Sequence, residues 1–415
     1  MKPIAASIST RFNLRYTFAA LQYPNYRLWF TGQLVSLVGT WMQSTAQAYL
    51  VFELTKSPAY LGYVGFAAGL PSWLFTLYGG VIADRISRRT MLLVTQSVMM
   101  VLAFLLAALV FTDLIQPWMI IVMAACLGVA NAFDAPARVS FVAELVDRKD
   151  LTNGIALNSI MFNSATVVGP AVAGMAYAAF GPAWCFTLNG LSFVAVIAAL
   201  LAMRLPPLAP QLERRSALKE LKEGMLYTAG NRVILTLIIS MGVLSLFGLS
   251  MMTLLPAWST DVLGGDARTY GWLLSGRGIG ALIGAFMIAS TSRLGIKGRL
   301  WTIGNLTMPV MLAVFAMVRL LPLALVMIIL TGWSFMVQVN TSNALVQTQV
   351  EDRLRGRVMS IYTLIFFGGM PLGALLAGQL AERTSEPATL LLNAAMLAVF
   401  AVFVVLRLPF IRKLS

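Results

Sequence analysis

The segment GGVIADRISRRT, residues 79–90, sets four charged side chains within six residues, between two long apolar stretches. Charge is rare elsewhere, because 11% of all residues are charged and 59% are hydrophobic. A soluble domain has about 25% charged residues, and a chain as apolar as this one cannot cover itself with polar surface in water. The stretches that flank the segment therefore belong in a membrane, and the segment itself belongs at the membrane surface.

Apolar stretches long enough to cross a bilayer recur along all 415 residues, and the mean hydropathy is +0.82. A hydrocarbon core about 30 Å thick requires roughly 20 apolar residues per helix, whereas the strands of a β-barrel would alternate apolar and polar residues. We therefore predict an all-α membrane protein. The twelve predicted transmembrane helices cover residues 26–52, 59–82, 90–111, 117–143, 151–178, 183–203, 232–260, 269–290, 299–318, 322–348, 358–382 and 386–408.

The formal net charge of +14 is distributed unevenly among the segments that connect these helices. Most Lys and Arg residues lie in alternate connections, starting with the N-terminal segment, and the other side has only Lys56, Arg268, Arg319 and Arg383. By the positive-inside rule, this pattern predicts an even number of spans with both termini in the cytoplasm. We expect the basicity to reflect topology and attraction to anionic lipid rather than binding of nucleic acid.

The residues that carry enzymatic or metal chemistry are scarce. The chain has no histidine, which excludes histidine metal ligands and histidine proton relays, and both cysteines (Cys126 and Cys185) lie in predicted spans, where a structural disulfide is not expected. The sequence contains no G-x-x-x-x-G-K-[ST], H-E-x-x-H or G-x-S-x-G motif. We therefore expect no cofactor, no metal site and no enzymatic activity.

A polar interval at residues 206–231 separates six predicted spans from six others and divides the chain into 1–205, a linker and 232–415. The halves resemble each other, because GPAVAG at 169–174 aligns at an offset of 204 residues with GALLAG at 373–378. Parallel repeats of this kind are typical of transporters whose halves rock about a central site. An apolar stripe in the linker (Leu218, Leu221, Met225) predicts either an amphipathic helix on the inner leaflet or a solvated tether.

The pattern G-x-x-x-D-R-x-S-R-R at residues 80–89 resembles the cytoplasmic signature loop between the second and third helices of the major facilitator superfamily. The resemblance covers essentially the whole chain, with one departure at Ser87, where the superfamily usually has glycine. It implies twelve helices in two pseudo-symmetric bundles of six and a transport function.

The superfamily also implies a role for this loop in closing a cytoplasmic gate. Its second and eleventh helices are neighbours, so Asp84 would meet the positive end of the eleventh helix dipole. At the inner end of the fourth span, Glu144 or Asp147 would pair with an arginine of the loop, namely Arg85, Arg88 or Arg89. The alternative is that these arginines only set the topology.

The stretch GPAVAG resembles the fifth-span signature of proton-driven antiporters in the superfamily, which implies export rather than uptake. Pro170 is expected to kink this span, and Gly169 and Gly174 to permit close packing or bending there. Small residues also recur at four-residue spacing in predicted spans two, eight and eleven. We expect the interface between the halves at these stripes, which are Gly65–Gly69, Gly276–Gly280–Gly284 and Gly369–Gly373.

Charged residues deep in a span are functional candidates by default. Asp134 and Arg138 lie four residues apart on one face of the fourth span, in a stretch, NAFDAPARVSFVAEL, that resembles the enterobactin-exporter and macrolide-efflux branch of the superfamily. They are either a fixed structural pair or a proton-coupling site with a titrating carboxylate. Glu53 is a further candidate for coupling.

Arg277 is the third deep charge, and it is expected either to hold an anionic group of the substrate or to pair with Glu53. Amide and aromatic residues on the cavity-type helices suit a bulky amphipathic ligand, although any single amide can instead bond to a neighbouring helix. The further candidates for substrate binding are Gln33, Trp41, Gln43, Gln47, Asn158, Asn163, Trp333, Gln338 and Asn340.

These features together predict a monomeric secondary transporter of the bacterial inner membrane, with a siderophore or an amphipathic drug-like molecule as the substrate. Export in exchange for protons is the favoured reading, since the fifth-span stretch resembles antiporters. Import of an iron–siderophore complex in the same fold is an alternative. A membrane scaffold that transports nothing is an alternative of another class.

Overall fold

The computed structural model describes residues 18–83, 86–205, 217–291 and 294–414. The first part of the chain forms η1 (Ala19–Gln22), α2 (Pro24–Thr55), α3 (Pro58–Ala83), α4 (Arg88–Phe111), α5 (Pro117–Leu145), α6 (Leu151–Phe180) and α7 (Pro182–Ala202). The rest forms α8 (Ala217–Gly230), α9 (Arg232–Val243), η2 (Leu244–Gly248), α10 (Ser250–Ala257), η3 (Trp258–Val262), α11 (Ala267–Thr291), α12 (Lys297–Met317), α13 (Leu321–Gln349), α14 (Arg355–Arg383), α15 (Glu386–Arg407) and η4 (Pro409–Lys413).

A helix is present at every range where the sequence predicts a span, and the ends differ by three residues or fewer. Ten helical runs in the described part of the chain are long and apolar enough to cross a membrane: α4 to α7, Arg232–Val262, and α11 to α15. Neither α2 nor α3 is among the ten, and the amides of Gln33, Gln43 and Gln47 lower the hydropathy of α2. The chain is therefore a multi-pass membrane protein, and the count of twelve spans stays a prediction.

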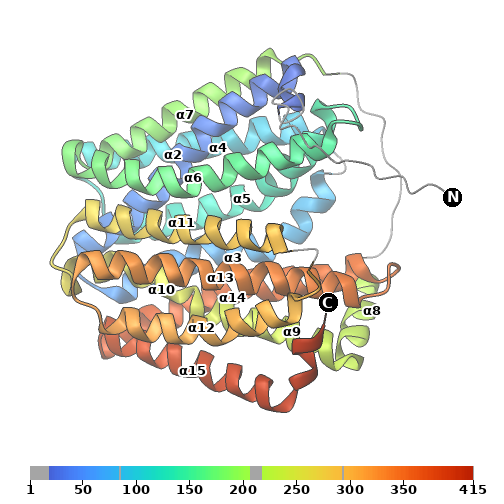
Figure 1. Cartoon of the computed structure of the whole chain (residues 1–415). Coiled ribbons are helices and arrows are strands. Elements are labelled where there is room, and N and C mark those ends of the chain that lie inside the picture. Colours follow the sequence, from blue (N-terminus) through green and yellow to red (C-terminus); the bar gives the residue numbers. More distant parts are fainter. Residues whose placement is uncertain (1–17, 84–85, 206–216, 292–293, 415) are drawn as a thin grey trace, which may run out of the picture.

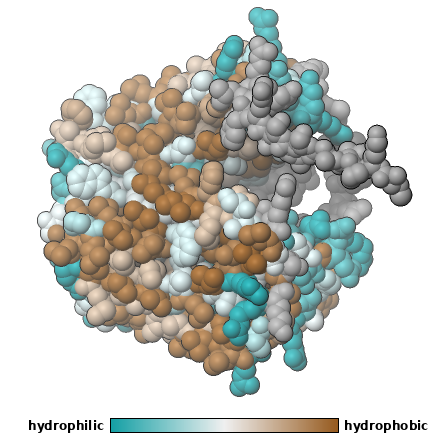
Figure 2. All heavy atoms as spheres, viewed as in Figure 1, coloured by the Kyte–Doolittle hydropathy of each residue, from teal (hydrophilic) through white to brown (hydrophobic). Residues whose placement is uncertain are grey.

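Short connections make consecutive helices run back and forth across the molecule, as Figure 1 shows. One end, here called the basic end, has the connections at 146–150 and 350–354 together with α8, and lies at the right of Figure 1. The opposite end has the connections at 56–57, 181 and 384–385. In Figure 2, apolar side chains cover the middle of the visible face, as expected for a surface that meets lipid.

The predicted seventh span is a helix interrupted by two wide turns. Residues 232–262 form α9, the π-helical η2, α10 and the π-helical η3 in succession. The run begins at Asn231, whose side chain accepts hydrogen bonds from the amides of Val233 and Ile234. A π turn within an α-helix often marks a functional position, and η2 borders the α14 helix through close contacts of Gly369 and Gly373.

Buried apolar residues form separate clusters in the two parts of the chain. The largest cluster has its buried members between Ile234 and Ile411, and a second has its members between Ala20 and Met203. A third, mainly from α2 to α7, also includes Ala257 and Ala267 and so joins the two parts near the opposite end. The predicted linker forms α8, which packs on the start of α14 through an ion pair between Glu223 and Arg357.

Small residues join the two parts of the chain at two helix pairs, as predicted. A methyl group on Gly65 of α3 would lie 2.9 Å from the Ala374 Cβ of α14. A methyl group on Gly271 of α11 would lie 2.4 Å from the carbonyl oxygen of Pro170 in α6. Backbones approach this closely only where no side chain intervenes.

The other predicted stripes are wrong as interface elements between the halves. Gly280 and Gly284 face α13, since a Cβ on Gly280 would lie 1.9 Å from the Ile329 carbonyl oxygen. Gly369 and Gly373 of α14 likewise face η2 rather than α3. The spacing of small residues predicts a close approach, but it does not say which neighbour approaches.

Candidate functional site

A cavity of about 850 Å³, here called the main cavity, lies between helices of the two parts of the chain. Its wall is mostly apolar, with Trp41 and Trp73 from α2 and α3, Met252 from α10, and Phe367 from α14. Arg277 of α11 also lines it. Aromatic and methionine side chains around one positive charge suit a ligand that is largely apolar and bears an anionic group.

The main cavity reaches the basic end of the molecule. Its lining includes Gly356 in the first turn of α14 and continues along that helix to Ala374. The wall also includes Trp73, whose indole N–H donates a hydrogen bond of 2.9 Å to the carbonyl oxygen of Leu364.

Contacts between the two parts of the chain close the cavity at the opposite end. Tyr49 of α2 stacks on Tyr270 of α11 with ring centroids 6.2 Å apart. Glu382 at the end of α14 accepts a hydrogen bond of 2.6 Å from the Ser57 hydroxyl and one of 3.2 Å from the Ala59 amide. The cavity is thus open toward the basic end and closed toward the opposite end.

Arg277 does not pair with Glu53, so that predicted alternative is wrong. The Arg277 guanidinium lies 5.9 Å from the ring centroid of Phe335, and its Nε is buried without a hydrogen-bond partner among the described residues. Glu53 is exposed near the opposite end and accepts a hydrogen bond from the Tyr177 hydroxyl. The guanidinium therefore remains available to a ligand in the main cavity.

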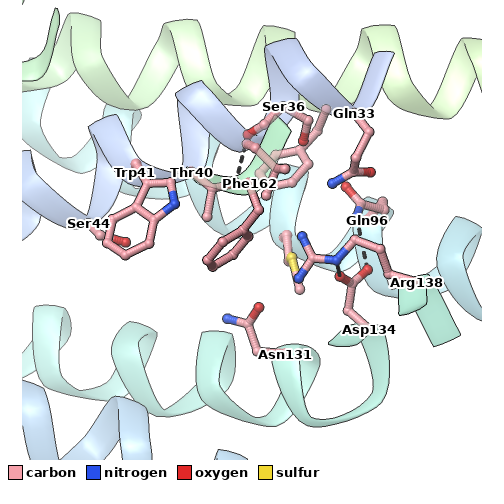
Figure 3. A pocket seen from close by; sticks show the side chains of 13 residues that line it. Gln33, Ser36, Thr40, Trp41, Ser44, Gln96, Asn131, Asp134, Arg138 and Phe162 are labelled. Carbon is pink, nitrogen blue, oxygen red and sulfur yellow. Dashed lines mark hydrogen bonds and ion pairs between the residues drawn. The ribbon is translucent and has the colours of Figure 1, made fainter. Parts of the chain in front are cut away.

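A second cavity of about 160 Å³, here called the side pocket, lies within the first part of the chain (Figure 3). Its polar lining comes from α2, α4 and α5: Gln33, Ser36, Thr40, Ser44, Gln96, Asn131, Asp134 and Arg138. Phe162 of α6 packs edge-on against Trp41 with ring centroids 6.1 Å apart. Trp41 and Asn131 line both cavities, so the side pocket adjoins the main cavity.

Asp134 is buried in the wall of the side pocket with every contact satisfied. Its Oδ1 accepts hydrogen bonds of 2.9 Å from the Thr95 hydroxyl and 2.9 Å from the Gln96 amide. Its Oδ2 lies 3.5 Å from Nε of Arg138, one turn along α5, so the predicted contact is present. Both carboxylate oxygens are therefore occupied by neighbours from α4 and α5.

Most of the other amides predicted to bind substrate lie outside both cavities and bond to neighbouring helices. Gln43 accepts a hydrogen bond of 2.6 Å from Asn189, and Gln338 donates one of 2.9 Å to Asn305. Gln47 donates to a carbonyl oxygen of α5, and Asn163 donates to one of its own helix. These contacts are the interhelical or intrahelical bonds that were the alternative reading of the amides.

Three further candidates also line neither cavity. Asn158 is half-buried, and its Oδ1 has no hydrogen-bond partner among the described residues. Trp333 packs with its backbone against Gly280 and Gly284, and Asn340 is half-buried on α13. Of the predicted substrate-binding residues, Gln33, Trp41 and Arg277 are thus the ones that line a cavity.

The charged loop is described only from Ile86 onward, so Asp84 and Arg85 lie outside the described residues. Arg88 forms an ion pair with Glu144 of α5, as one of the predicted pairings has it. Arg89 donates a hydrogen bond of 2.9 Å to the carbonyl oxygen of Leu201 at the end of α7. Both contacts lie within the first part of the chain and do not by themselves join it to the second.

The other predicted pairing partner, Asp147, belongs to a separate cluster at the basic end. It accepts a hydrogen bond of 3.0 Å from the Tyr23 hydroxyl, which also donates one of 2.7 Å to Asp150. The pKa of the Tyr23 phenol is raised above its ordinary value, chiefly because of its hydrogen bond to the Asp150 carboxylate. This cluster ties the start of α2 to the connection between α5 and α6.

The predicted gating residues of α6 have different neighbours. A methyl group on Gly169 would lie 2.5 Å from the Trp41 Cβ, so this glycine sets the distance between α6 and α2 beside the side pocket. A methyl group on Gly174 would lie 2.6 Å from the Ala267 carbonyl oxygen of α11. Pro170 and Gly174 therefore lie at the contact between the two parts of the chain, near the opposite end.

Several residues of the site escaped the sequence reading. Asn131 precedes Asp134 by three residues and so shares its helix face, a spacing that could have identified it. Thr95, Gln96 and Trp73 gave no such signal, since a single polar or aromatic residue in a span has no periodicity. Among the described residues, no group of three or more His, Cys, Asp or Glu side chains could hold a metal ion.

Comparison with known families agrees with this geometry. The family model described as "Transmembrane secretion effector" matches residues 15–414. The multidrug efflux pump Tap of Mycolicibacterium fortuitum is 29% identical over 401 residues, covering 92% of this chain and 95% of that protein. The enterobactin exporter EntS of Escherichia coli is 24% identical over 401 residues, covering 94% and 93%. The staphyloferrin A transporter of Staphylococcus aureus is 24% identical over 357 residues, covering 84% and 88%.

Solved structures show the same fold. The nucleoside transporter NupG superposes with a TM-score of 0.71 at 17% identity, covering 92% of this chain and 98% of that chain. A bacterial homologue of the lysosomal transporter Spinster, in an inward-facing and occupied conformation, superposes with a TM-score of 0.71 at 14% identity, covering 94% and 96%.

Proposed function

The chain belongs to the transmembrane secretion effector family of the major facilitator superfamily, and we propose that it exports a siderophore or an amphipathic drug-like molecule across the bacterial inner membrane. It is a transporter and not an enzyme. The observation that carries the proposal is the apolar main cavity of about 850 Å³, which contains Arg277 and opens at the basic end. A cavity of this size accepts a drug-sized ligand.

The relatives support export and the class of substrate. Two of them are named as exporters or efflux pumps, EntS for enterobactin and Tap for multiple drugs, and a third is named as a transporter of staphyloferrin A. These are large molecules with polar and apolar parts, which fits a wide cavity with few polar groups.

The proposed architecture has twelve transmembrane helices, the ten apolar runs together with α2 and α3. They form two six-helix bundles at residues 1–205 and 232–415, with residues 206–231 as the linker between them. The excess of Lys and Arg at the basic end supports a cytoplasmic location of that end and of both termini. We propose that the protein works as a monomer, because one chain contains a complete cavity.

Alternating access would proceed by rocking of the two bundles about the main cavity. The structure would then be the inward-open state, closed at the opposite end by α6 against α11 and by α3 against α14. Asp84 and the loop arginines would close the basic end in the other state. The pair formed by Arg88 and Glu144 would support that gate from within the first bundle by fixing the loop to α5.

We propose that the proton-motive force drives this export. Of the two predicted roles of Asp134, its contacts support the structural pair, because a proton on Asp134 would have to displace Arg138 or a hydrogen-bond donor from α4. Asp134 as the proton carrier is the second reading. Glu53 lies at the opposite end beside Tyr177, where it would meet periplasmic protons first.

Transport into everted inner-membrane vesicles tests the proposal. Vesicles that contain the protein should accumulate enterobactin, staphyloferrin A or a lipophilic drug when respiration makes their interior acidic and positive. Thr363→Trp, which fills the main cavity, should abolish the accumulation, whereas Val399→Trp on the exposed face of α15 should not. Uptake by intact cells instead would indicate an importer, and no transport of any of these compounds would favour a scaffold.

A further inference from the structure

We propose that the side pocket binds the acidic group of the substrate through Arg138, while the apolar body of the substrate occupies the main cavity. The transported molecule is then an amphipathic acid whose carboxylate, or ionised phenol or catechol, is the recognised end. This inference rests on the proposed function, and it adds the position, the chemistry and the binding residue of the polar end.

The exposure of the ion pair in the side pocket decides the sign of the ligand. The side chain of Arg138 is 19% exposed, whereas that of Asp134 is 2% exposed. Both oxygens of Asp134 are occupied, as described above, and Arg138 contacts them through Nε. A ligand in the pocket can therefore reach the positive partner but not the negative one.

The end of the Arg138 side chain is free to bind. Its terminal nitrogens make no hydrogen bond with any residue that the structure describes, and Figure 3 shows the guanidinium extending from Asp134 into the pocket, toward Phe162. A guanidinium presents a planar set of donors that matches a carboxylate. An amine or another donor-only group would meet the same surface with the wrong charge and no acceptor.

The rest of the side pocket adds neutral hydrogen-bonding groups around this donor. The amides of Gln33 and Asn131 and the hydroxyls of Ser36 and Ser44 line it. The Oε1 atoms of Gln33 and Gln96 are buried without a donor among the described residues. A buried acceptor without a partner is costly, so an acid that also has a hydroxyl group would satisfy the pocket better than a simple carboxylate.

The two cavities divide one ligand between them. The side pocket, at about 160 Å³, has room for a head group only, whereas the main cavity, at about 850 Å³, has room for a large apolar body. Trp41 and Asn131 line both, so a ligand that spans them passes between these side chains. Arg277 in the main cavity has no carboxylate partner among the described residues and supplies a second site for negative charge.

Binding of three probes with the same ring and different charge tests the inference. The probes are 2-naphthoate, 2-naphthamide and 2-naphthamidine, whose planar head groups are anionic, neutral and cationic. Affinities for the purified full-length protein in detergent are measured at neutral pH by equilibrium dialysis. We expect 2-naphthoate to bind about ten-fold more tightly than the amide, as one charged hydrogen-bonded contact allows, and the amidine to bind most weakly.

Two variants and a matched control assign this preference to the side pocket. Asp134→Asn with Arg138→Gln removes both charges, and it should bring the naphthoate affinity to within about three-fold of the amide affinity. Ser44→Leu, which fills the pocket from α2, should do the same and serves if the double variant does not fold. Asp352→Asn with Arg355→Gln removes an exposed Asp–Arg pair outside both cavities and should keep the full preference.

The inference is overturned if the amidine binds most tightly, if all three probes bind equally, or if the double variant and Ser44→Leu both keep the preference for naphthoate. Because binding is measured without transport, a failure of export in vesicles leaves this result intact. Conversely, export of a neutral or cationic drug by a protein without any preference for naphthoate would support the proposed function and refute the acid site.

Discussion

Replacing Gly271 by Ala should shift the protein from the observed state toward the state that opens at the opposite end. A methyl group at Gly271 would lie 2.4 Å from the Pro170 carbonyl oxygen and 3.1 Å from the Gly174 Cα, both on α6. The first of these contacts is too short for real atoms, and its partner is backbone that cannot turn aside. The two helices must therefore move apart where they now close the cavity.

The size of the shift follows from the cost of overpacking. An added methyl group in a well-packed contact costs typically about 1–3 kcal/mol. In the alternative state α6 and α11 separate at this end, so the cost is absent there, and the ratio of the two states should change by about 5- to 150-fold. The helix-propensity gain from Gly to Ala, about 1 kcal/mol, applies to both states and cancels.

Distances between spin labels at Lys56 and Arg383 measure this ratio directly. Both side chains are exposed at the opposite end, on segments that the Ser57–Glu382 hydrogen bond holds together. The labels are introduced after the native cysteines have been replaced (Cys126→Ala, Cys185→Ala). The short distance should dominate in the parent protein, and Gly271→Ala should add or enlarge a longer one.

Gly276→Ala is the matched control, because it adds the same methyl group on the same helix but toward α13. Its nearest neighbour would be the Ile328 side chain at 3.2 Å, within the second part of the chain. The distance distribution should then match the parent. Equal shifts from both variants, or none from Gly271→Ala, would refute the assignment of the contact between α6 and α11 as the closed gate.

Three further changes probe other contacts of the same structure. Glu382→Ala removes the acceptor at the opposite end and should shift the label distances in the same direction as Gly271→Ala, by about 1 kcal/mol or roughly five-fold. Trp73→Phe removes the hydrogen bond to Leu364 and should lower the free energy of unfolding by about 1 kcal/mol, seen as a lower melting temperature in detergent. Asp134→Asn should lower the free energy of unfolding by about 3 kcal/mol, because Arg138 loses its partner; adding Arg138→Gln should restore most of it, and a double variant as unstable as the single one would contradict the pair.

The helices were predictable from the sequence because a membrane imposes a length and a hydropathy on each span. The predicted ends agree with the structure to within three residues, and one reason is local chemistry such as proline at the first turn of α2, α5 and α7. The two π turns at η2 and η3 were not predictable, since they insert a residue into the helix without changing its composition.

The walls of the cavities were predictable only where a residue was both polar and deep. Arg277, Asp134 and Arg138 were identified because a charge in a span has few explanations. Amides such as Gln43 and Gln338 gave the same signal, but neighbours from other helices satisfy them, and no sequence pattern names those neighbours. The apolar walls gave no signal, because lipid, core and cavity all accept the same side chains.

The charge of the substrate limits how its export can be driven. Each negative charge that leaves a cell across 100 mV gains about 2.3 kcal/mol, so an acid draws on the membrane potential without any exchange of protons. A proton on Asp134 would remove the negative charge 3.5 Å from the Arg138 guanidinium and thereby strengthen binding of an acid there. Proton and acid would then favour each other at this pair instead of competing, which is the opposite of what a direct exchange requires. A preference for 2-naphthoate would therefore assign Asp134 to the structural role and place any proton exchange elsewhere, with Glu53 as the remaining candidate.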